Sequence, residues 1–293
     1  MRIMVLGAQG MLGKDLVPIL SRRHEVVGKD IQDFDITDEK QADREIAKFK
    51  PAVVINAAAY TNVDGCESQQ DLAFAVNAEG AQNVARACSR SSAAMIQLST
   101  DYVFDGRSLI PYGEDAQPNP ISIYGKSKHQ GERYIQEILE NFLIIRTAWL
   151  YGRHGKNFVD TILNLSSQPG PLKVVNDQKG SPTFTKDLSR ALESIVEKQP
   201  RGVLHVTNSG SCSWYEFAQN ILEIGVPEHS RKKIIPISSG ELNRPAPRPA
   251  NSVLDCNRFK ELTGDRMRPW QTALKEYLDE KENTPSRSTD HHS

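Results

Sequence analysis

Tyr124 and Lys128 stand four residues apart in the segment Tyr-Gly-Lys-Ser-Lys. On a helix this spacing brings both side chains to one face, with their polar ends close together. A phenol has a pKa of about 10 and exchanges protons poorly at neutral pH unless a nearby ammonium favours its ionised form. The pair therefore predicts a tyrosine that acts as a general acid toward the oxygen of a carbonyl group that receives a hydride.

Thr100 belongs to a Ser-Thr-Asp segment that closes an apolar run at residues 94–98. If that run is a strand of a parallel sheet, Thr100 lies at the carboxyl edge, where its hydroxyl can hydrogen-bond the same carbonyl oxygen. Alone, Tyr-x-x-x-Lys is more often a pair on a helix surface than a site. The order of a glycine loop, Thr100 and then the Tyr/Lys pair favours one active site, with Thr100, Tyr124 and Lys128 as its catalytic residues.

Three glycines follow the first apolar run with the spacing Gly-x-x-Gly-x-x-Gly, at Gly7, Gly10 and Gly13. Between a strand and a helix, such glycines permit a tight turn, a close approach of a pyrophosphate and close helix packing. The free amides at the helix start then face the anion. The loop predicts a nicotinamide dinucleotide site, the alternative being a turn without a ligand. The expected contacts are Gly7, Gln9, Gly10, Met11, Leu12 and Gly13.

The adenosine end of the cofactor gives a mixed signal, because Lys29 and Asp30 are adjacent after the second apolar run. A carboxylate at this place binds a ribose diol, whereas a cation binds a 2′-phosphate. Both NADPH and NADH therefore stay open, with Asp30 as a predicted contact. Asp35 and Ile36 are expected to meet the adenine, although the segment could instead cap the next helix.

A run of small residues, Asn-Ala-Ala-Ala, ends the third apolar run. At the carboxyl edge of a sheet, small side chains leave room for a cofactor, although alanine is also common in tight cores. The predicted contacts here are Ala57, Ala58 and Ala59, and Tyr124 and Lys128 are expected to contact the cofactor as well.

The elements that must position these residues alternate between short apolar runs and longer helical segments. The expected strands are Ile3–Leu6, Glu25–Gly28, Ala52–Ile55, Ala94–Leu98 and Phe142–Arg146. The expected helices are Met11–Leu20, Asp38–Phe49, Ala73–Ser89 and Gly125–Leu139. This alternation predicts an α/β fold with a doubly wound parallel sheet of the Rossmann type.

After Trp149 glycine and proline become frequent, which predicts a smaller C-terminal α/β lobe that binds the substrate. Helices are expected at Asp187–Glu197 and Trp214–Leu222, and a loop at Ser238–Asn251, where prolines prevent a regular helix. The expected organisation is a cofactor domain at 1–150, a substrate lobe at 151–280 whose chain could return to the first domain, and a disordered tail at 281–293.

Composition narrows the classes of partner. The chain of 293 residues has 36 basic and 37 acidic residues, so no overall positive field favours nucleic acid. The four cysteines are scattered, with no zinc-binding spacing, and are expected to be reduced thiols. Glycine and glutamine interrupt the first apolar run before it reaches the length of a signal-peptide core, and no apolar run suits a membrane span. We expect a cytoplasmic protein that binds no membrane.

Several motifs together resemble one family. They are Asn-Ala-Ala-Ala-Tyr-Thr-Asn-Val-Asp at 56–64, Ser-Thr-Asp-Tyr-Val-Phe-Asp-Gly at 99–106, the Tyr124 segment, Arg-Thr-Ala-Trp-Leu-Tyr at 146–151, Asn-Asp-Gln with Gly-Ser-Pro-Thr at 176–183 and Arg-Pro-Ala-Asn-Ser at 248–252. Over nearly its whole length the chain resembles the dTDP-4-dehydrorhamnose reductase family of extended short-chain dehydrogenases. The resemblance implies reduction of the C4 ketone of a dTDP-linked 6-deoxy-4-keto-L-sugar to dTDP-L-rhamnose by NADPH or NADH.

The same resemblance assigns Thr100, Tyr124 and Lys128 to the catalytic trio and Tyr102 and Trp149 to sugar contacts. The alternative for the two sugar contacts is core packing. In a loop, Arg248 could pair with a substrate diphosphate or simply be solvated. The resemblance also allows a homodimer and Mg²⁺ held by acidic residues at a dimer contact, but no metal ligand of this chain is assigned.

Three other functions compete with this interpretation. A dehydratase of nucleotide sugars is disfavoured because Asp101 is followed by Tyr102 and not by a glutamate, which elimination of water would use. A catalytically silent regulator resembling the β subunit of methionine adenosyltransferase would have no need for the catalytic trio. A reductase or epimerase for another nucleotide sugar would share every cofactor motif and differ in the C-terminal lobe.

Overall fold

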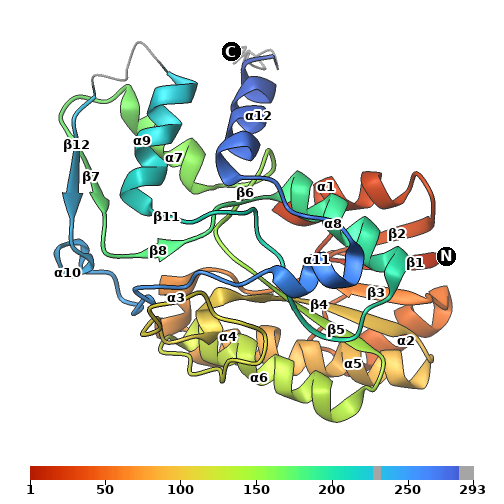
Figure 1. Ribbon diagram of the computed structural model, residues 1–293. Coiled ribbons are helices and arrows are strands. Elements are labelled where there is room, and N and C mark those ends of the chain that lie inside the picture. Colours follow the sequence, from red (N-terminus) through yellow and green to blue (C-terminus); the bar gives the residue numbers. More distant parts are fainter. Residues whose placement is uncertain (227–231, 284–293) are drawn as a thin grey trace, which may run out of the picture.

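A six-stranded parallel sheet forms the centre of the computed structural model, which describes residues 1–226 and 232–283 (Figure 1). In the order β10-β5-β4-β3-β1-β2, its strands are β1 (Arg2–Leu6), β2 (Glu25–Lys29), β3 (Val53–Asn56), β4 (Ala94–Thr100), β5 (Phe142–Thr147) and β10 (Gly202–His205). β1 pairs with both β2 and β3, so the direction of winding reverses between them. At such a reversal, a crevice opens at the carboxyl ends of the strands.

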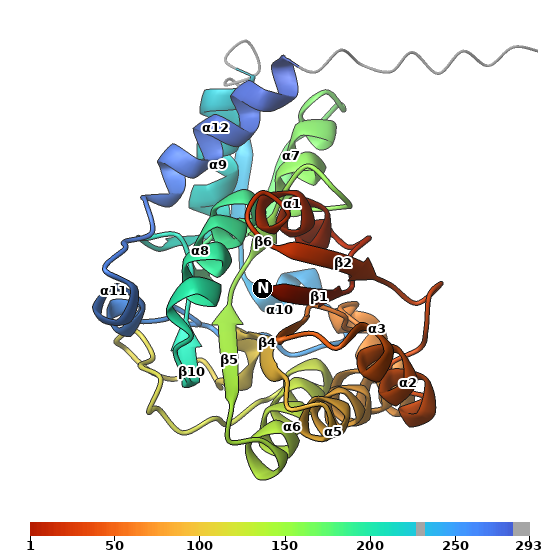
Figure 2. The ribbon, with the colours of Figure 1, turned by 90° about the vertical axis from the view of Figure 1, so that its right-hand side faces the viewer.

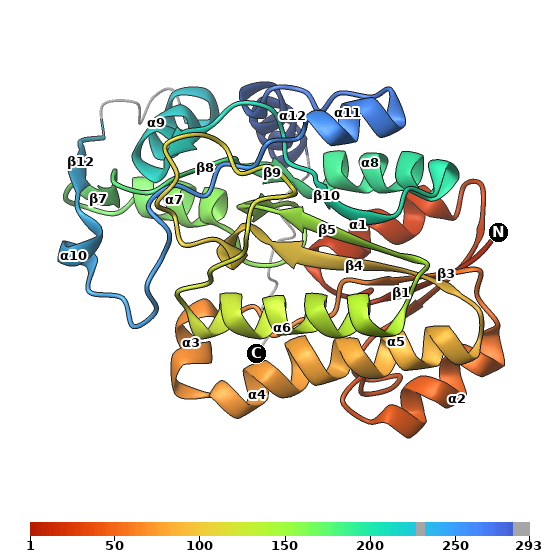
Figure 3. The same cartoon turned by 60° about the horizontal axis from the view of Figure 1, so that its bottom comes forward.

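Helices cover both faces of this sheet (Figures 2 and 3). One face carries α1 (Met11–Leu20) and α8 (Thr185–Lys198), which pack side by side. The other carries α2 (Glu39–Phe49), α5 (Ala81–Arg90) and α6 (Ile123–Ile138). The predicted α/β class with a doubly wound parallel sheet is therefore confirmed.

The sixth strand of the sheet comes from the C-terminal half of the chain. β10 pairs in parallel with β5, and α8 precedes β10 in the chain. Leu188 and Leu192 of α8 are completely buried in the same apolar core as Leu16 of α1 and Val5 of β1. The two halves of the chain thus share one core.

The rest of the C-terminal half forms a second layer of helices and short strand pairs. Its elements are β6 (Leu150–Tyr151), α7 (Phe158–Ser166), β7 (Leu172–Val175), β8 (Lys179–Gly180), β9 (Thr183–Phe184), β11 (Cys212–Ser213), α9 (Trp214–Gly225), β12 (Ile234–Ile237) and α12 (Trp270–Glu282). Here Tyr151, Phe184, Phe217 and Tyr277 pack as one buried aromatic cluster. The short helix α11 (Asn257–Thr263) packs instead on α8 and β10, in the core of the central sheet. The disordered tail predicted at 281–293 starts two residues too early, because Lys281 and Glu282 still belong to α12. From residue 284 onward the predicted tail lies outside the described residues.

Two segments differ from their expected form. The helix expected at Ala73–Ser89 is divided into α4 (Gln70–Phe74), a π-helical turn η1 (Ala75–Gly80) and α5. The wider turn places Asn77 so that its amide nitrogen donates to the Ser127 hydroxyl of α6 at 3.0 Å. The loop expected at Ser238–Asn251 begins with the short helix α10 (Ser239–Leu242), which ends before the prolines.

Short helices complete the sheet edge. α3 (Val63–Ser68) follows β3 and begins with Asn62, whose side chain accepts from the Gly65 amide. A single 3-10 turn, η2 (Asp101–Val103), follows β4, and the Thr100 hydroxyl caps it by accepting from the Tyr102 amide. Both elements start at the carboxyl edge of the sheet, beside the crevice.

Candidate active site

The glycine loop between β1 and α1 is packed so closely that side chains are excluded. Gly7 has a φ of +76°, and a Cβ there would lie 2.7 Å from the Ala58 nitrogen. A Cβ on Gly13 would lie 2.3 Å from the Gly7 carbonyl oxygen. Gly10 is the N-cap of α1, and no side chain caps the helix, so its first amides are available to an anion. The loop fits the pyrophosphate of a dinucleotide.

A pocket of about 400 Å³ next to the loop suits the adenosine end. Its lining consists of Leu6, Gly7, Gln9, Gly10, Lys29, Asp30, Ile31, Phe34, Asp35, Ile36, Ala57, Ala58, Ala59 and Val76. The Asp30 carboxylate accepts from the Gln9 amide at 2.7 Å, while the Lys29 ammonium lies 3.7 Å from Asp33 and 3.6 Å from Glu45. Carboxylate and cation thus share one wall, and each is already partnered.

The positions of residues 35–38 are compatible with both of the roles considered for them. Asp35 and Ile36 line the adenosine pocket. Asp38 caps α2 by accepting from the amides of Lys40 and Gln41. The two sequence interpretations apply to neighbouring residues and do not exclude each other.

A second cleft, of about 490 Å³, adjoins this pocket through the glycine loop and contains the predicted catalytic residues. It is lined by Gly7, Gly10, Met11, Leu12, Gly13, Ala57, Ala59, Thr61, Val63, Leu98, Ser99, Thr100, Asp101, Tyr102, Tyr124, Lys128, Thr147, Ala148, Trp149, Leu150, Lys156 and Trp214. Three different elements, β4, η2 and α6, bring Thr100, Tyr102 and Tyr124 to this cleft. Residues distant in sequence therefore meet as the sequence predicts.

The predicted catalytic side chains are buried to different degrees, since Thr100 and Lys128 are buried and Tyr124 is half-buried. Burial raises the pKa of Tyr124, and a hydrogen bond with the Thr100 hydroxyl opposes that rise. Burial lowers the pKa of Lys128 to about 8, and the negative charge of Glu132 acts in the opposite direction. A phenol that holds its proton until a nearby oxygen gains negative charge suits a proton donor.

The Lys128 ammonium is placed differently from the simplest expectation. Its Nζ donates to the Leu98 carbonyl oxygen of β4 at 2.7 Å. Helical spacing brings Tyr124 and Lys128 to one cleft, but the described hydrogen bond of the ammonium goes to the sheet and not to the phenol. The lysine thereby also ties α6 to β4.

Asp101 follows Thr100 and is completely buried beside the cleft. Its Oδ1 accepts from the Thr100 hydroxyl at 3.0 Å, and its Oδ2 has no hydrogen-bond partner among the described residues. Burial raises the pKa of Asp101 to about 6, against the effect of the neighbouring hydroxyl groups of Ser252 and Thr100. The carboxylate holds the threonine hydroxyl in place.

Aromatic rings form the part of the cleft assigned to the sugar. Tyr102 meets Tyr124 edge to face, with ring centroids 5.7 Å apart. Trp149 has a φ of +47° and stacks on Trp214 with centroids 3.5 Å apart. A Cβ on Gly180 would lie 2.4 Å from the Trp149 ring, so the indole is held on both sides. Trp214 and Lys156 were not predicted, because they belong to the C-terminal half and to no motif.

Arg248 is occupied by another partner. Its guanidinium donates to both carboxylate oxygens of Asp64, at 3.1 and 3.0 Å, and it does not line the cleft. Arg244 and the Ala246 amide also donate to Asp64. The proline-containing loop after α10 is thus anchored to α3, and Arg248 supports the loop.

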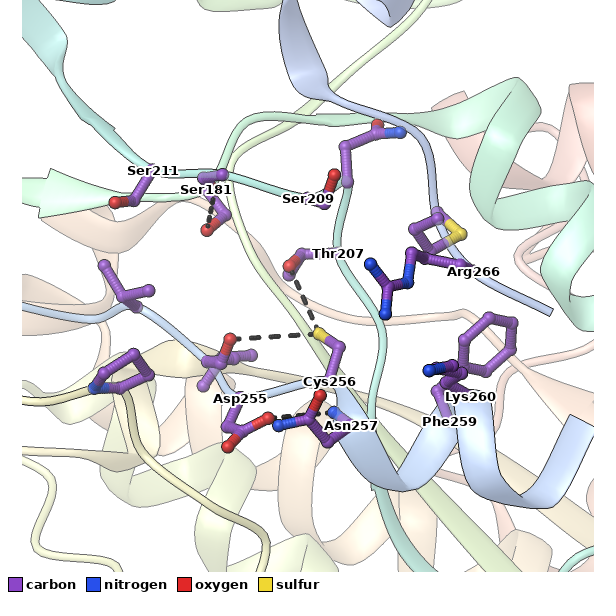
Figure 4. Close-up of a pocket in the computed structure, with 16 residues that line it drawn as sticks. Ser181, Thr207, Ser209, Ser211, Asp255, Cys256, Asn257, Phe259, Lys260 and Arg266 are labelled. Carbon is purple, nitrogen blue, oxygen red and sulfur yellow. Dashed lines mark hydrogen bonds between the residues drawn. The ribbon is translucent and has the colours of Figure 1, made fainter. Parts of the chain in front are cut away.

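Another cavity, of about 420 Å³, lies beyond the end of β10 (Figure 4). Lys260 and Arg266 lie on one side of it, and Ser181 and Ser211 lie on another. None of the predicted site residues lines it. The chemistry assigned to the chain therefore belongs to the cleft beside the glycine loop.

Residues 1–226 and 232–283 contain no helix that is long and apolar enough to cross a bilayer. Nor do three or more His, Cys, Asp or Glu side chains gather there in an arrangement that could hold a metal ion.

Comparison with known proteins places the chain among sugar-nucleotide enzymes. The family model described as RmlD substrate binding domain matches residues 1–283. A dTDP-4-dehydrorhamnose reductase of Streptomyces griseus is 41% identical over 284 residues, covering 94% of this chain and 92% of the relative. A dTDP-4-keto-6-deoxy-D-glucose reductase of Streptomyces niveus is 38% identical, covering 93% and 95%.

Two solved structures agree with this placement. The crystal structure of a dTDP-4-dehydrorhamnose reductase from Clostridium acetobutylicum is 43% identical, with a TM-score of 0.92 over 96% of this chain and 100% of that one. The enzyme of the same name from Bacillus anthracis, solved in complex with NADP, is 37% identical, with a TM-score of 0.89 over 95% and 99%. Matches of this extent show that the chain belongs to the dTDP-4-dehydrorhamnose reductase family.

Proposed function

We propose that this protein reduces the C4 ketone of dTDP-4-dehydro-L-rhamnose to dTDP-L-rhamnose. The observation that carries the proposal is that Thr100, Tyr124 and Lys128 line the same cleft as Gly7 and Gly10. The names of the relatives supply the substrate class, because the cleft alone specifies a ketone and not its nucleotide. Residues 1–150 are assigned to the cofactor and 151–280 to the substrate.

The cofactor assigned to the glycine loop is NADPH or NADH, which supplies a hydride when bound. Gly7, Gly10 and the first amides of α1 would hold its pyrophosphate, and Asp30, Asp35 and Ile36 would contact its adenosine end. The Bacillus anthracis relative was solved with NADP, which favours NADPH. The Lys29 ammonium would then meet the 2′-phosphate.

The chain's own residues handle the proton and the orientation of the ketone. Tyr124 donates the phenolic proton to the C4 oxygen, and the Thr100 hydroxyl hydrogen-bonds the same oxygen. The Lys128 ammonium, held at the Leu98 carbonyl, favours the tyrosinate left behind.

The substrate would lie against the aromatic side of the cleft. Tyr102 and the stacked pair of Trp149 and Trp214 line this side, where the apolar edge of the pair would contact a deoxysugar that has few hydroxyl groups. Lys156 lines the cleft and, in the described part of the chain, has no ion-pair partner, so its ammonium is the cation we assign to the diphosphate. This role replaces the one considered for Arg248.

The test is turnover of purified protein with NADPH or NADH and the dTDP-4-keto sugar, followed as loss of absorbance of the reduced nicotinamide. Tyr124→Phe removes the proton donor and should lower kcat by about 10²- to 10⁴-fold while cofactor binding persists. Tyr134→Phe, a change on the same helix outside the cleft, should behave as wild type.

Three outcomes would contradict the proposal. Binding of cofactor without reduction of any keto sugar would indicate the regulatory function. Equal activity of Tyr124→Phe and wild type would remove the assigned proton donor. A preference for dTDP-4-keto-6-deoxy-D-glucose, the substrate named for the Streptomyces niveus relative, would keep the chemistry and change the substrate.

Assembly and place of action complete the proposal. We expect a homodimer, as the resemblance allows, and light scattering of the purified protein measures the mass. We also expect action in the cytoplasm, which is supported by the four free cysteines, since disulfides are rare in reducing compartments.

A further inference from the structure

Three side chains on one face of α6 contact successive positions near the end of β4. Tyr124, Lys128 and Glu132 are spaced by four residues, so they lie above one another along the helix. Lys128 donates to the Leu98 carbonyl at 2.7 Å, and the Ser99 hydroxyl donates to Glu132 Oε1 at 2.5 Å. The two contacts fix the position of α6 along β4. They therefore also fix the position of Tyr124 relative to Thr100, the residue that follows Ser99.

Glu132 is held as a carboxylate in the interior. Its side chain is 1% exposed, and the Arg146 guanidinium of β5, which is 3% exposed, donates to Oε1 at 3.0 Å and to Oε2 at 2.8 Å. Burial would raise the pKa of Glu132, but hydrogen bonds from His129, Arg146 and Ser99, together with the charge of Arg146, hold it at about 2. The carboxylate is thus ionised throughout the neutral range.

We propose that Glu132 is a positioning residue of the active site, which fixes Ser99 and α6 against β4 and stabilises the ammonium of Lys128 one helical turn away. The proposal rests on the proposed function, because that function gives Thr100, Tyr124 and Lys128 their roles. Glu132 lies outside the cleft lining and therefore acts through its neighbours.

Several titratable and charged groups lie around Lys128 and Glu132. They are Tyr124 and His129 on α6, Asp101 and Tyr102 on η2, Cys66 on α3, Arg146 on β5 and His205 on β10. Of all charges near Lys128, that of Glu132 is the one that raises its pKa against the effect of burial. Without this carboxylate, the pKa of Lys128 should fall below its present value of about 8.

The first experiment measures this charge effect without turnover. The Lys128 side chain is titrated by NMR in protein labelled with ¹³C-lysine, and its signal is assigned by its loss in Lys128→Met. In Glu132→Gln the midpoint should fall by roughly one pH unit, because an opposite charge near a buried ammonium is lost. Glu137→Gln neutralises an exposed carboxylate of α6 that pairs with Arg133 at 3.7 Å, and should leave the midpoint unchanged.

A second variant, in which both members of the buried ion pair are neutralised, is needed in case Glu132→Gln does not fold. Removing one member of a buried ion pair leaves the other uncompensated and is often strongly destabilising. Glu132→Gln combined with Arg146→Gln leaves no unpaired guanidinium, and it should show a smaller downward shift, because a positive charge is removed together with the negative one. An unchanged midpoint in folded Glu132→Gln would overturn the proposal.

The second experiment separates position from charge. Ser99→Ala breaks the contact between β4 and Glu132 but keeps the ion pair, so kcat should fall about tenfold while the Lys128 midpoint and the KM for cofactor stay unchanged. Ser99→Thr restores a hydroxyl and should recover most of the rate. Wild-type kcat in Ser99→Ala would remove the positional part of the proposal.

The two experiments distinguish this proposal from the proposed function. Failure of wild type to reduce any keto sugar would overturn the function alone, because the NMR titration still judges the effect of Glu132 on Lys128. An active wild type with an unchanged titration in Glu132→Gln would overturn this proposal alone.

Discussion

Trp214 shapes the sugar end of the cleft although no motif marks it. It is the first residue of α9, where the Ser213 side chain caps the helix, and its indole stacks on Trp149. Aromatic pairs of this kind contribute about 0.5–1.5 kcal/mol beyond the burial of their area. Under the proposed function, the pair would form a rigid apolar wall beside the sugar.

Trp214→Ala should therefore raise the KM for the sugar nucleotide up to about tenfold, while kcat changes little, because the catalytic trio keeps its own supports. Steady-state kinetics with varied sugar nucleotide measure this split. Trp214→Phe preserves an aromatic face and is the matched variant. A fall in kcat without a change in KM would assign Trp214 to the chemical step instead.

At the residue scale, the sequence predicts what depends on local spacing. Tyr124 and Lys128 share a helix, and Thr100 ends a strand, so their positions follow from the period of each element. Arg248 shows the limit of this reasoning. Its partner Asp64 lies on α3, far away in the chain, and a sequence does not reveal which carboxylate a loop arginine will meet.

At the scale of elements, glycine allows two close contacts around the loop that precedes α1: Gly13 of α1 lies against Gly7, and Gly7 lies against Ala58, just after β3. The helix occupies the residues predicted for it, Met11–Leu20, because apolar periodicity and the preceding strand act together. In contrast, the single helix predicted at Ala73–Ser89 is interrupted by a π-helical turn. That interruption depends on the tertiary contacts of Asn77, with Tyr60 as well as Ser127, which periodicity does not encode.

Gly13→Ala should separate α1 from the loop, because the added methyl would lie 2.3 Å from the Gly7 carbonyl oxygen. We expect at least about tenfold weaker binding of NADPH and a lower Tm, since strain of this kind costs about 1–3 kcal/mol. Fluorescence titration with NADPH and thermal melting measure both effects. Gly113→Ala adds a methyl group where no atom lies within 4 Å, and serves as the control. Equal affinity in both variants would contradict the assignment of the loop.

At the scale of the whole molecule, a buried polar chain joins the sheet to α6. Arg146 of β5 lies between Glu132 of α6 and His205 of β10, and the His205 ring contacts the Tyr112 carbonyl at 3.0 Å. Burial, followed by the charge of Arg146, lowers the pKa of His205 to about 3. Native protein therefore keeps this histidine neutral while the unfolded chain protonates it at about pH 6.5.

The free energy of unfolding should consequently decrease in two stages as the pH is lowered. Below about pH 6.5 the unfolded chain binds a proton that native His205 does not, at about 1.4 kcal/mol per pH unit for each such proton. Below about pH 4.5 the unfolded form of Glu132 adds a second proton, because its native pKa is about 2. Urea unfolding at a series of pH values measures the slope.

His205→Gln removes the first of these two protons and should flatten the dependence between about pH 7 and about pH 5. The matched control is His154→Gln, which replaces a histidine whose side chain is 39% exposed. Identical slopes for His205→Gln and wild type would exclude His205 as the origin of the first stage.

The crossing of the C-terminal half into the central sheet also limits recombination between relatives with different sugar preferences. A chimaera joined at residue 150 would take β10 and α8 from one parent and β5 and α1 from the other, so foreign side chains would have to fit Leu188 and Leu192. A chimaera that is meant to change the sugar preference should therefore exchange only the parts of the substrate segment (151–280) that lie outside residues 183–205. These residues should travel with the parent that donates the glycine loop.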